Sequence, residues 1–313
     1  MKKQTLFVIM FFSCRILFAQ DPHFTQYNNA RTYTNPAFTG CDSTLNLSAN
    51  YRDQWPAVNA YQSFLFSADK YVRCFKGGVG INFLQDSEMG GVITTSRVDL
   101  NYAAHIELCK HRLVIQPGIQ VSCFQRHIDL SKLTFGDMID ERRGFAYSSN
   151  EVPERDARSV TDFSAGLLVH AKWIYGGIAL MHFTEPDQGI FSVSKLPAKL
   201  VVHAGANIEV GNKNGAGILS PNILYMRQGD SYMFLPGLIL KIRSISVGFS
   251  YRSEDAVIGT LAFQNRHLRV GYSYDYTVSK LTNKATGGSH EIGITWFVNF
   301  KKSVCTRNTL RLI

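Results

Sequence analysis

The sequence predicts an all-β fold, a transmembrane antiparallel β-barrel of about 14 strands with an N-terminal non-strand segment. Three observations lead to this prediction: segments of strict two-residue alternation, the lack of a long apolar stretch after the N-terminus, and a segregation of long and short connections. Side chains of a strand point alternately to its two faces, so alternation describes a ribbon with one apolar and one polar face. Such ribbons are typical of outer-membrane barrels, whose strands face lipid on one side and the lumen on the other.

The clearest alternation lies in the C-terminal quarter, between Ile245 and Phe300. From Leu268 to Tyr276 the apolar and aromatic residues alternate with Arg, Gly, Ser and Asp, and the pattern resumes from Ile292 onwards. No segment beyond the first 20 residues approaches the run of about 20 apolar residues that a membrane helix needs. A helical membrane protein is therefore excluded, whereas a barrel, whose lipid-facing residues are interleaved with polar ones, is not.

The chain divides into four parts. Residues 1–20 start with lysines and continue into an apolar run, which is the pattern of a secretory signal peptide. Residues 21–44 are rich in Asn, Thr and Tyr and contain the turn-forming string Asn35–Gly40, so we expect an N-terminal segment that packs in or under the barrel. Residues 45–300 would form the barrel, and 301–313 a basic C-terminal tail.

Fourteen segments carry strand patterns, an even number as expected for a closed bacterial barrel. They are 45–51, 62–71, 78–84, 92–108, 112–124, 163–171, 173–182, 200–210, 217–227, 232–242, 245–253, 256–264, 267–276 and 290–300. In the fourth of these, Arg97, Asp99, His105 and Glu107 share one face. Charged groups in that number suit neither lipid nor a dry core, so this face is expected to line a wet lumen.

The connections give an independent test. With both termini in the periplasm, the odd-numbered connections face outward, and these include the long ones, whereas the even-numbered ones are tight turns. Outer-membrane barrels show this asymmetry. The largest connection, 126–162, is highly charged and is expected to fold over the barrel, plug it or bind a partner, with a disordered tip as the plainest alternative.

Charge and cysteine content exclude several classes of protein. The net charge of +9 is spread over strands and loops without a basic run, which favours lumen and rim charges over a nucleic-acid interface. Cys14 would leave with the signal peptide, and no CxxC pair is present, so a zinc or thioredoxin-like site has no support. The disulfide pairing stays open among the remaining cysteines, which are Cys41, Cys74, Cys109, Cys123 and Cys305.

No catalytic, cofactor-binding or metal-binding residues are predicted. His105, His170 and His203 lie on polar strand faces and are expected to be hydrogen-bonded lumen residues rather than metal ligands. Ser289, His290 and Glu291 are consecutive in a strand, so their side chains alternate and cannot form a relay. The run Gly77–Gly80 lacks the Lys-Ser/Thr of a phosphate loop and is expected to be a tight turn.

Arg52, Asp53 and Trp55 are the candidate partner-binding residues. They lie in the first predicted outward connection, and Trp and Arg are favoured in interface hot spots. The alternative is a self-packed loop with an ion pair between Arg52 and Asp53.

Several short motifs stand out along the chain. The opening carries Asp21-Pro22-His23-Phe24-Thr25-Gln26-Tyr27, then Asn35-Pro36-Ala37-Phe38-Thr39-Gly40 and Tyr51-Arg52-Asp53-Gln54-Trp55. The middle carries Thr161-Asp162-Phe163-Ser164-Ala165-Gly166 and His182 through Pro186. The C-terminal part carries Gly271-Tyr272-Ser273-Tyr274-Asp275-Tyr276 and Gly287-Gly288-Ser289-His290-Glu291-Ile292. In order and spacing these motifs resemble those of the PorP/SprF proteins of Bacteroidetes.

The resemblance implies a non-enzymatic outer-membrane component of the type IX secretion system, with periplasmic termini. Such a protein supports secretion or surface attachment of cargo proteins such as gliding adhesins. Its expected partners are a secreted cargo protein or its C-terminal domain, other secretion-system components and outer-membrane lipid, and no nucleic acid. Two alternatives stay open, a diffusion or uptake channel for a small solute and a membrane-embedded hydrolase.

Overall fold

A computed structural model describes residues 21–42, 44–108, 113–140, 142–145, 147, 149, 155–211, 217–280 and 282–298. The predicted signal peptide and basic tail lie outside these residues, as do Cys109 and Cys305. Within them, no helix is long and apolar enough to span a membrane.

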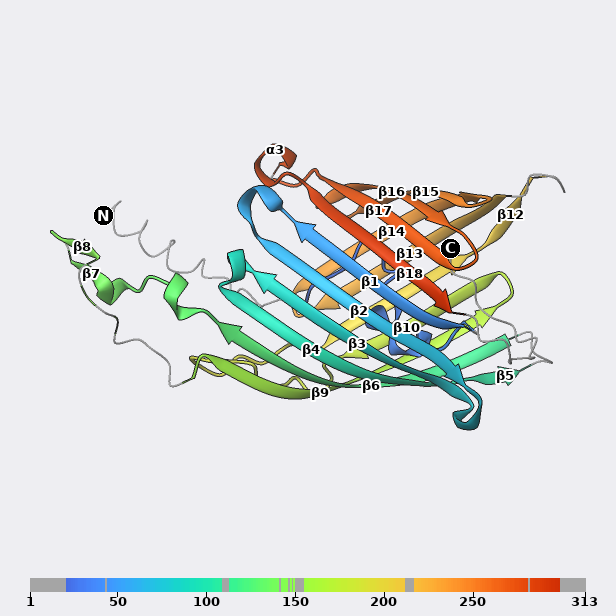
Figure 1. The fold of residues 1–313 in the computed structure, drawn as a ribbon, viewed down its shortest axis with the longest axis horizontal. Helices are drawn as coiled ribbons and strands as arrows, with labels where there is room; N and C mark the ends of the chain where they lie inside the picture. Colours follow the sequence, from blue (N-terminus) through green and yellow to red (C-terminus); the bar gives the residue numbers. More distant parts are fainter. Residues whose placement is uncertain are drawn as a thin grey trace, which may run out of the picture.

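The wall of the barrel is one antiparallel sheet (Figure 1). Its strands are β1 (Leu45–Gln54), β2 (Tyr61–Val72), β3 (Gly77–Glu88), β4 (Ile93–Ala104), β5 (Ile106–Leu108), β6 (Leu113–Ile128), β9 (Ala157–Ala171), β10 (Ile174–Met181), β11 (Lys199–Ala206), β12 (Ile208–Val210), β13 (Gly217–Gln228), β14 (Ser231–Ile242), β15 (Ile245–Arg252), β16 (Ala256–Gln264), β17 (Leu268–Thr277) and β18 (Ser289–Val298). A single residue, His105, separates β4 from β5, and both pair with β6. Likewise, Asn207 separates β11 from β12, and both pair with β13.

The sheet closes on itself because β1 pairs with β18, with Leu45 opposite Val298. Counting β4–β5 and β11–β12 as one strand each, the closed barrel has 14 strands, which confirms the prediction. The alternation assigns the faces as expected. In β4, Leu100 is 60% exposed on the outer face, whereas Arg97 and Asp99 are buried on the lumen face. An apolar outer face and a polar inner one are what a barrel in lipid requires.

The connections at one end of the barrel are short and several of those at the other are long. We call the two ends the short-turn end and the long-loop end. The short-turn end carries η3 (Arg73–Phe75) and the two-residue turns after β9 and β14. The long-loop end carries η2 (Pro56–Val58), η4 (Met89–Gly91), α3 (Asn283–Thr286) and the long connections that follow β6 and β10, and Figure 1 shows α3, β7 and β8 at this end. This is the asymmetry that the sequence predicts.

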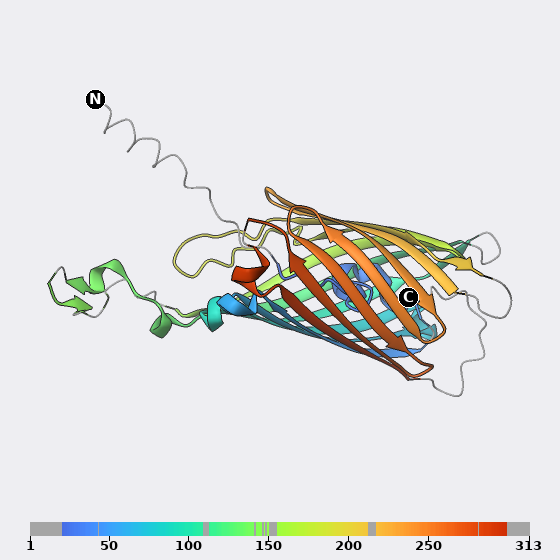
Figure 2. The same ribbon diagram turned by 90° about the horizontal axis from the view of Figure 1, so that it is seen from above.

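The largest connection differs from its prediction. Strands β6 and β9 extend further than expected, so the connection runs only from residue 129 to 156. It carries η5 (Leu130–Lys132), η6 (Gly136–Met138) and a small hairpin of β7 (Ile139–Asp140) and β8 (Gly144–Phe145). The hairpin projects away from the barrel in both ribbon views (Figures 1 and 2), so the described part of this connection does not plug the lumen.

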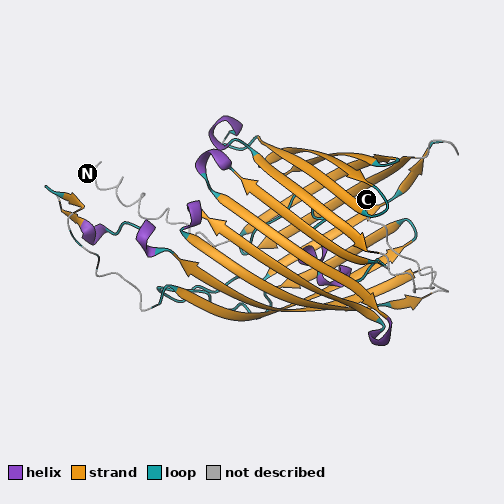
Figure 3. Cartoon of the chain, in the orientation of Figure 1, coloured by secondary structure: helices purple, strands orange, loops and turns teal. Residues whose placement is uncertain are grey.

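The lumen instead contains residues 21–42, which we call the plug. This segment has two short helices, α2 (Arg31–Thr34) and η1 (Pro36–Phe38), which Figure 3 shows inside the barrel. Its aromatic residues Phe24, Tyr27, Tyr33 and Phe38 are buried. The lumen is therefore filled over much of its length, whereas the polar strand faces had suggested a wet one.

The plug crosses the barrel from one end to the other. Asp21 lies at the long-loop end, where its carboxylate contacts His182 and Lys199 beside the ends of β10 and β11. Cys41 lies near the short-turn end, where β1 begins. The two ends of the described chain, Asp21 and Val298, therefore lie at opposite ends of the barrel. The predicted periplasmic termini lie outside the described residues and stay a prediction.

Glycines in the wall let the plug backbone approach. The run Gly77–Gly80 opens strand β3 and is not the tight turn that was predicted. A Cβ on Gly78 would lie 2.0 Å from the Thr39 oxygen, and one on Gly118 would lie 2.5 Å from the Ala37 nitrogen. Glycine in a strand often marks such a close backbone approach.

We expect Gly118→Ala to lower the free energy of unfolding by about 1–3 kcal/mol, because the added methyl group forces the plug and β6 apart. Gly259→Ala is the matched control, since a Cβ on Gly259 would meet no atom within 4 Å. Urea-induced unfolding of both refolded variants measures the difference. Equal stabilities for the two variants would show that the plug does not pack on β6 in this way.

Candidate functional site: the plug interface and the two mouths

A buried network of charges binds the plug at Thr25 and Gln26, near the start of this segment. It consists of Arg52, Arg252, Asp275 and Glu291, which come from β1, β15, β17 and β18. Arg52 contacts Asp275 at 2.8 Å and Glu291 at 3.3 Å, and Arg252 contacts Asp275 at 2.9 Å. All four side chains are at most 4% exposed. We call these four residues the lumen charge network.

The plug completes this network through Thr25 and Gln26. The backbone N–H groups of Thr25 and Gln26 donate to the two carboxylate oxygens of Glu291, at 2.7 and 2.9 Å. The Thr25 hydroxyl accepts from Arg52 and Arg252, both at 2.7 Å, and donates to Asp275. Charge-assisted hydrogen bonds of this kind are about twice as strong as neutral ones, so they fix the plug in register with the wall.

Three of the four residues of this network, and Thr25 of the plug, come from motifs that are distant in the sequence. Thr25 lies in the opening motif, Arg52 in the third, and Asp275 and Glu291 in the two C-terminal ones. The motif segments on which the family resemblance rests therefore meet inside the barrel, where they bind the plug. The sequence did not indicate this, because no motif by itself shows which charges face each other.

A second set of charges binds the plug at the long-loop end. His182 lies between two carboxylates, with Nε2 2.6 Å from Asp21 and Nδ1 2.6 Å from Asp162. Lys199 lies 3.6 Å from Asp21. Asp21 belongs to the plug, and the other three residues belong to the wall or its outer connection, so these contacts tie the start of the plug to β9, β10 and β11.

The predicted lumen histidines bind the other end of the plug. His203 contacts the Asn35 side chain at 3.0 Å and stacks on Phe38, and His105 contacts the Thr39 carbonyl at 3.0 Å. His170 contacts Gln116, whose oxygen accepts from the Cys41 thiol at 2.9 Å. These histidines are hydrogen-bonded lumen residues, as the sequence predicted.

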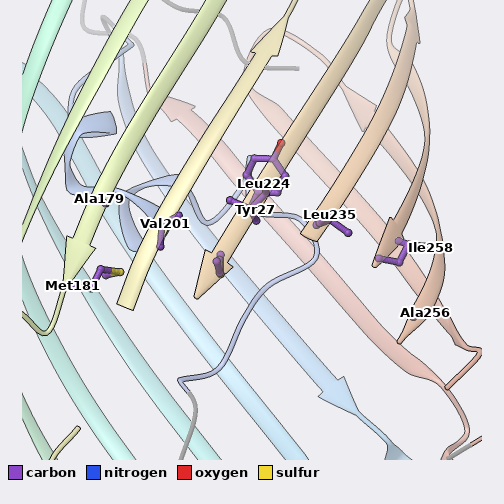
Figure 4. Close-up of a cluster of buried hydrophobic side chains, with 9 residues drawn as sticks. Tyr27, Ala179, Met181, Val201, Leu224, Leu235, Ala256 and Ile258 are labelled. Atoms are coloured by element: carbon purple, nitrogen blue, oxygen red, sulfur yellow. The ribbon is translucent and has the colours of Figure 1, made fainter. Parts of the chain in front are cut away.

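Part of the lumen wall is apolar. Tyr27 of the plug packs in a cluster that lies in the long-loop half of the barrel and is drawn in Figure 4. Its wall members, contributed by strands from β10 to β16, are Ala179, Met181, Val201, Leu224, Met226, Leu235, Ala256 and Ile258. The Tyr27 hydroxyl donates to Asn222 at 3.0 Å, which satisfies the polar end of this aromatic side chain.

A pocket of about 250 Å³ opens at the mouth of the long-loop end. Trp55 and Tyr232 form its rim, and Met226 and Met233 belong to its lining. Trp55 follows β1 in a left-handed backbone conformation with φ of 59°, which is uncommon for a bulky residue. Its ring meets the Tyr61 ring edge-on with centroids 5.9 Å apart, so the indole is held in place at the pocket.

The structure separates the three predicted partner-binding residues. Arg52 is 1% exposed and belongs to the lumen charge network, so it is not available to a partner outside the barrel. Its neighbour Asp53 points to the opposite face of the strand, so Arg52 pairs with Asp275 and Glu291 and not with Asp53. Of the three, only Trp55 lines the pocket.

The consecutive residues Ser289, His290 and Glu291 do not meet. Ser289 and Glu291 are buried on the lumen side, whereas His290 points outward, where its Nδ1 contacts the Tyr272 hydroxyl at 2.8 Å. The alternation of side chains in β18 thus keeps the imidazole away from the hydroxyl and the carboxylate.

The connection after β10 is pinned to the wall at the long-loop end. Asp187 pairs with Arg158 at 2.6 Å and accepts from the backbone N–H groups of Ser194 and Gly189. These N–H donors, followed by Arg158, hold the pKa of Asp187 below its usual value. Leu196 of the same connection is buried near the start of the plug, so this connection covers part of the mouth.

In the described parts of the chain, no group of three or more His, Cys, Asp and Glu side chains is placed to hold a metal ion. Of the described cysteines, Cys74 and Cys123 are free thiols, and the Cys41 thiol donates to the Gln116 side chain.

Comparisons with solved structures find other outer-membrane proteins at low sequence identity. The chain is similar to the toluene transporter TodX of Pseudomonas putida, with a TM-score of 0.49 and 9% identity over 88% of this chain and 95% of that one. It is also similar to the outer-membrane protein Omp33 of Acinetobacter baumannii, with a TM-score of 0.45 and 8% identity over 84% of this chain and 100% of that one. A search of curated protein sequences found no match.

The model of one protein family matches residues 16–296, which is nearly the whole chain. That family is described as the type IX secretion system membrane protein PorP/SprF. The match covers the plug and every strand of the barrel, including all the motifs that meet in the lumen. The chain belongs to the PorP/SprF family of outer-membrane components of the type IX secretion system.

Proposed function

We propose that this protein is a non-enzymatic barrel that supports the secretion or surface attachment of a cargo protein, such as an adhesin used in gliding. The observation that carries this proposal is the family match over residues 16–296. In this proposal residues 1–20 direct export, and the long-loop end faces the cell exterior. The partners are a cargo protein or its C-terminal domain and other components of the secretion system.

The plug supports this role over that of a diffusion channel. The segment is bound at several points along its length by buried polar contacts, among them Asp21 with His182, Thr25 with Glu291 and Asn35 with His203. Residues bound in this way do not leave the lumen for a passing solute. A barrel whose lumen is blocked by its own N-terminal segment suits a protein that holds a partner at its mouth.

The first test compares the surface and secreted proteomes of a deletion strain with those of the parent strain. Loss of one or a few surface proteins is the expected result, and the lost proteins would be the cargo. Loss of all proteins exported by the type IX system would indicate a role in the general machinery. An unchanged proteome would contradict the proposal and favour the channel.

Trp55 is the residue through which we propose that cargo is held. Replacing Trp55 with alanine removes an anchored aromatic side chain from the mouth pocket. A hot spot of this kind contributes at least about 2 kcal/mol, so we expect surface retention of cargo to weaken about 30-fold. Affinity of the purified barrel for the cargo identified above measures the change.

The matched control is Trp173→Ala, since Trp173 lies at the other end of the barrel, in the turn between β9 and β10. The abundance of both variants in the outer membrane is checked to exclude a folding defect. Equal cargo retention by the Trp55 variant and the parent would exclude the mouth pocket as the cargo site.

A further inference from the structure

The short-turn end of the lumen contains a cavity of about 670 Å³, which we call the vestibule. It lies between the plug and the strand ends, and its lining includes Arg31, Arg269, Lys241 and Glu209. Its volume is in the range of small-molecule sites, which span about 300–1,000 Å³. Neither the cargo role nor the plug contacts described above use this space.

Arg269 is the unusual residue of the vestibule. It comes from β17, with Gln264 and Thr295 as its neighbours on β16 and β18, and it is 9% exposed. Among the described residues, none forms a hydrogen bond or an ion pair with its guanidinium group. The other three buried arginines, Arg52, Arg97 and Arg252, each pair with a carboxylate.

An unpaired buried guanidinium needs an explanation. It carries five N–H donors and a fixed charge, and burying such a charge without a partner is costly. An acidic residue at a neighbouring position on β16 or β18 would neutralise the charge of Arg269. These positions carry Gln264 and Thr295 instead, so the free-energy cost of the buried charge is not removed. The space in front of Arg269 is therefore suited to an anion supplied from outside the chain.

The remaining charges of the vestibule support an anion. Arg31 pairs with Asp42 at 2.7 Å and Asp69 at 3.6 Å, so these three residues together carry one net negative formal charge. The other charged lining residues comprise four cations and one acid, namely Lys172, Lys241, Arg266, Arg269 and Glu209. The local potential is thus positive, and clefts lined by one sign of charge concentrate ions of the opposite sign.

The orientation of the Arg269 side chain excludes lipid headgroups as its ligand. The residue faces the lumen, as its outward-facing neighbours Leu268 and Val270 show by their exposure, so the barrel wall separates it from lipid headgroups. A guanidinium matches carboxylate and phosphate groups, to which it donates two parallel hydrogen bonds. We propose that the vestibule binds a small solute that carries a carboxylate or phosphate group, with Arg269 as its main ligand-binding residue.

The test is calorimetric titration of the purified full-length barrel in detergent with inorganic phosphate and, separately, with citrate. We expect saturable binding of at least one anion, and the one that binds better identifies the chemistry of the group. Arg269→Gln is expected to weaken binding about 10- to 100-fold, as loss of a charge-assisted hydrogen-bond pair implies. Arg269→Lys keeps the charge without the planar fork and should bind with intermediate affinity.

Arg266→Gln is the matched control, because Arg266 is an exposed arginine at the rim of the same vestibule. It should change the affinity much less than Arg269→Gln. Unfolding temperatures without ligand show whether the variants fold, and Arg269→Gln should be at least as stable as the parent, since it removes an unpaired buried charge. The parent alone should also unfold at a higher temperature as the anion concentration rises.

Three results would overturn the proposal. The first is no saturable binding of either anion at millimolar concentrations. The second is unchanged affinity in Arg269→Gln. The third is an equal loss of affinity in Arg266→Gln, which would place the anion at the rim and not at Arg269.

Discussion

Replacing Arg52 with glutamine should lower the free energy of unfolding by about 3–5 kcal/mol, the usual effect of breaking a buried ion pair from one side. Arg52 is the residue of the lumen charge network that contacts both carboxylates and the plug. Without it, Glu291 keeps the N–H donors of Thr25 and Gln26 but has no cation. Asp275 keeps Arg252 and the hydroxyl donor of Thr25. Urea-induced unfolding of the refolded barrel measures the loss.

A second replacement tests whether the loss comes from the unpaired charge. Glu291→Gln in the Arg52→Gln background removes the uncompensated carboxylate, so the double variant should recover part of the stability, as residues of one network do not act additively. Arg266→Gln, at an exposed arginine, should change the stability by no more than about 0.5 kcal/mol. A change below 1 kcal/mol in Arg52→Gln itself would show that the network does not hold the plug.

Removing the plug should turn a closed barrel into an open channel. The wall closes through the pairing of β1 with β18 and does not need residues 21–42 for closure. Deleting residues 22–42 exposes the polar lumen faces of the strands to water, which suits them. In planar bilayers we expect stepwise conductance from the deletion variant and none of comparable size from the intact protein.

The matched control replaces residues 130–155, the projecting connection between β6 and β9, by a short flexible linker. Since its hairpin points away from the lumen, this replacement should leave conductance unchanged (Figure 2). The two variants together show which segment blocks the lumen to ions. Conductance of the intact protein equal to that of the plug deletion would support the diffusion channel in place of a cargo holder.

Much of the fold could be predicted because its signals are local. Alternation in β4, β17 and β18 assigns each side chain to the lumen or the lipid face without any knowledge of the neighbouring strand. The lengths of the connections, also a local property, separate the two ends of the barrel. For this reason the 14 strands and the asymmetry of the loops were predictable, although β6 and β9 are longer than expected.

The contents of the lumen could not be predicted in the same way. The sequence shows that Arg52, Asp275 and Glu291 lie in strands. Their meeting, however, depends on the register of β1 against β18, which are far apart in the chain, and of β18 against β17. It also depends on the route of the plug, which places Thr25 between them. The same limit made Arg52 a candidate for partner binding and the run Gly77–Gly80 a candidate turn.

The sequence by itself determined that the chain is a barrel, how many strands it has, which faces meet lipid, and which family its motifs resemble. These follow from side-chain alternation and from short contiguous motifs. Only the tertiary structure decided that residues 21–42 fill the lumen, that the motifs bind this plug and that Trp55 and not Arg52 lies at the mouth. It also decided that Arg269 has no partner among the described residues. Those facts depend on long-range distances, which closure of the sheet fixes and no local pattern encodes.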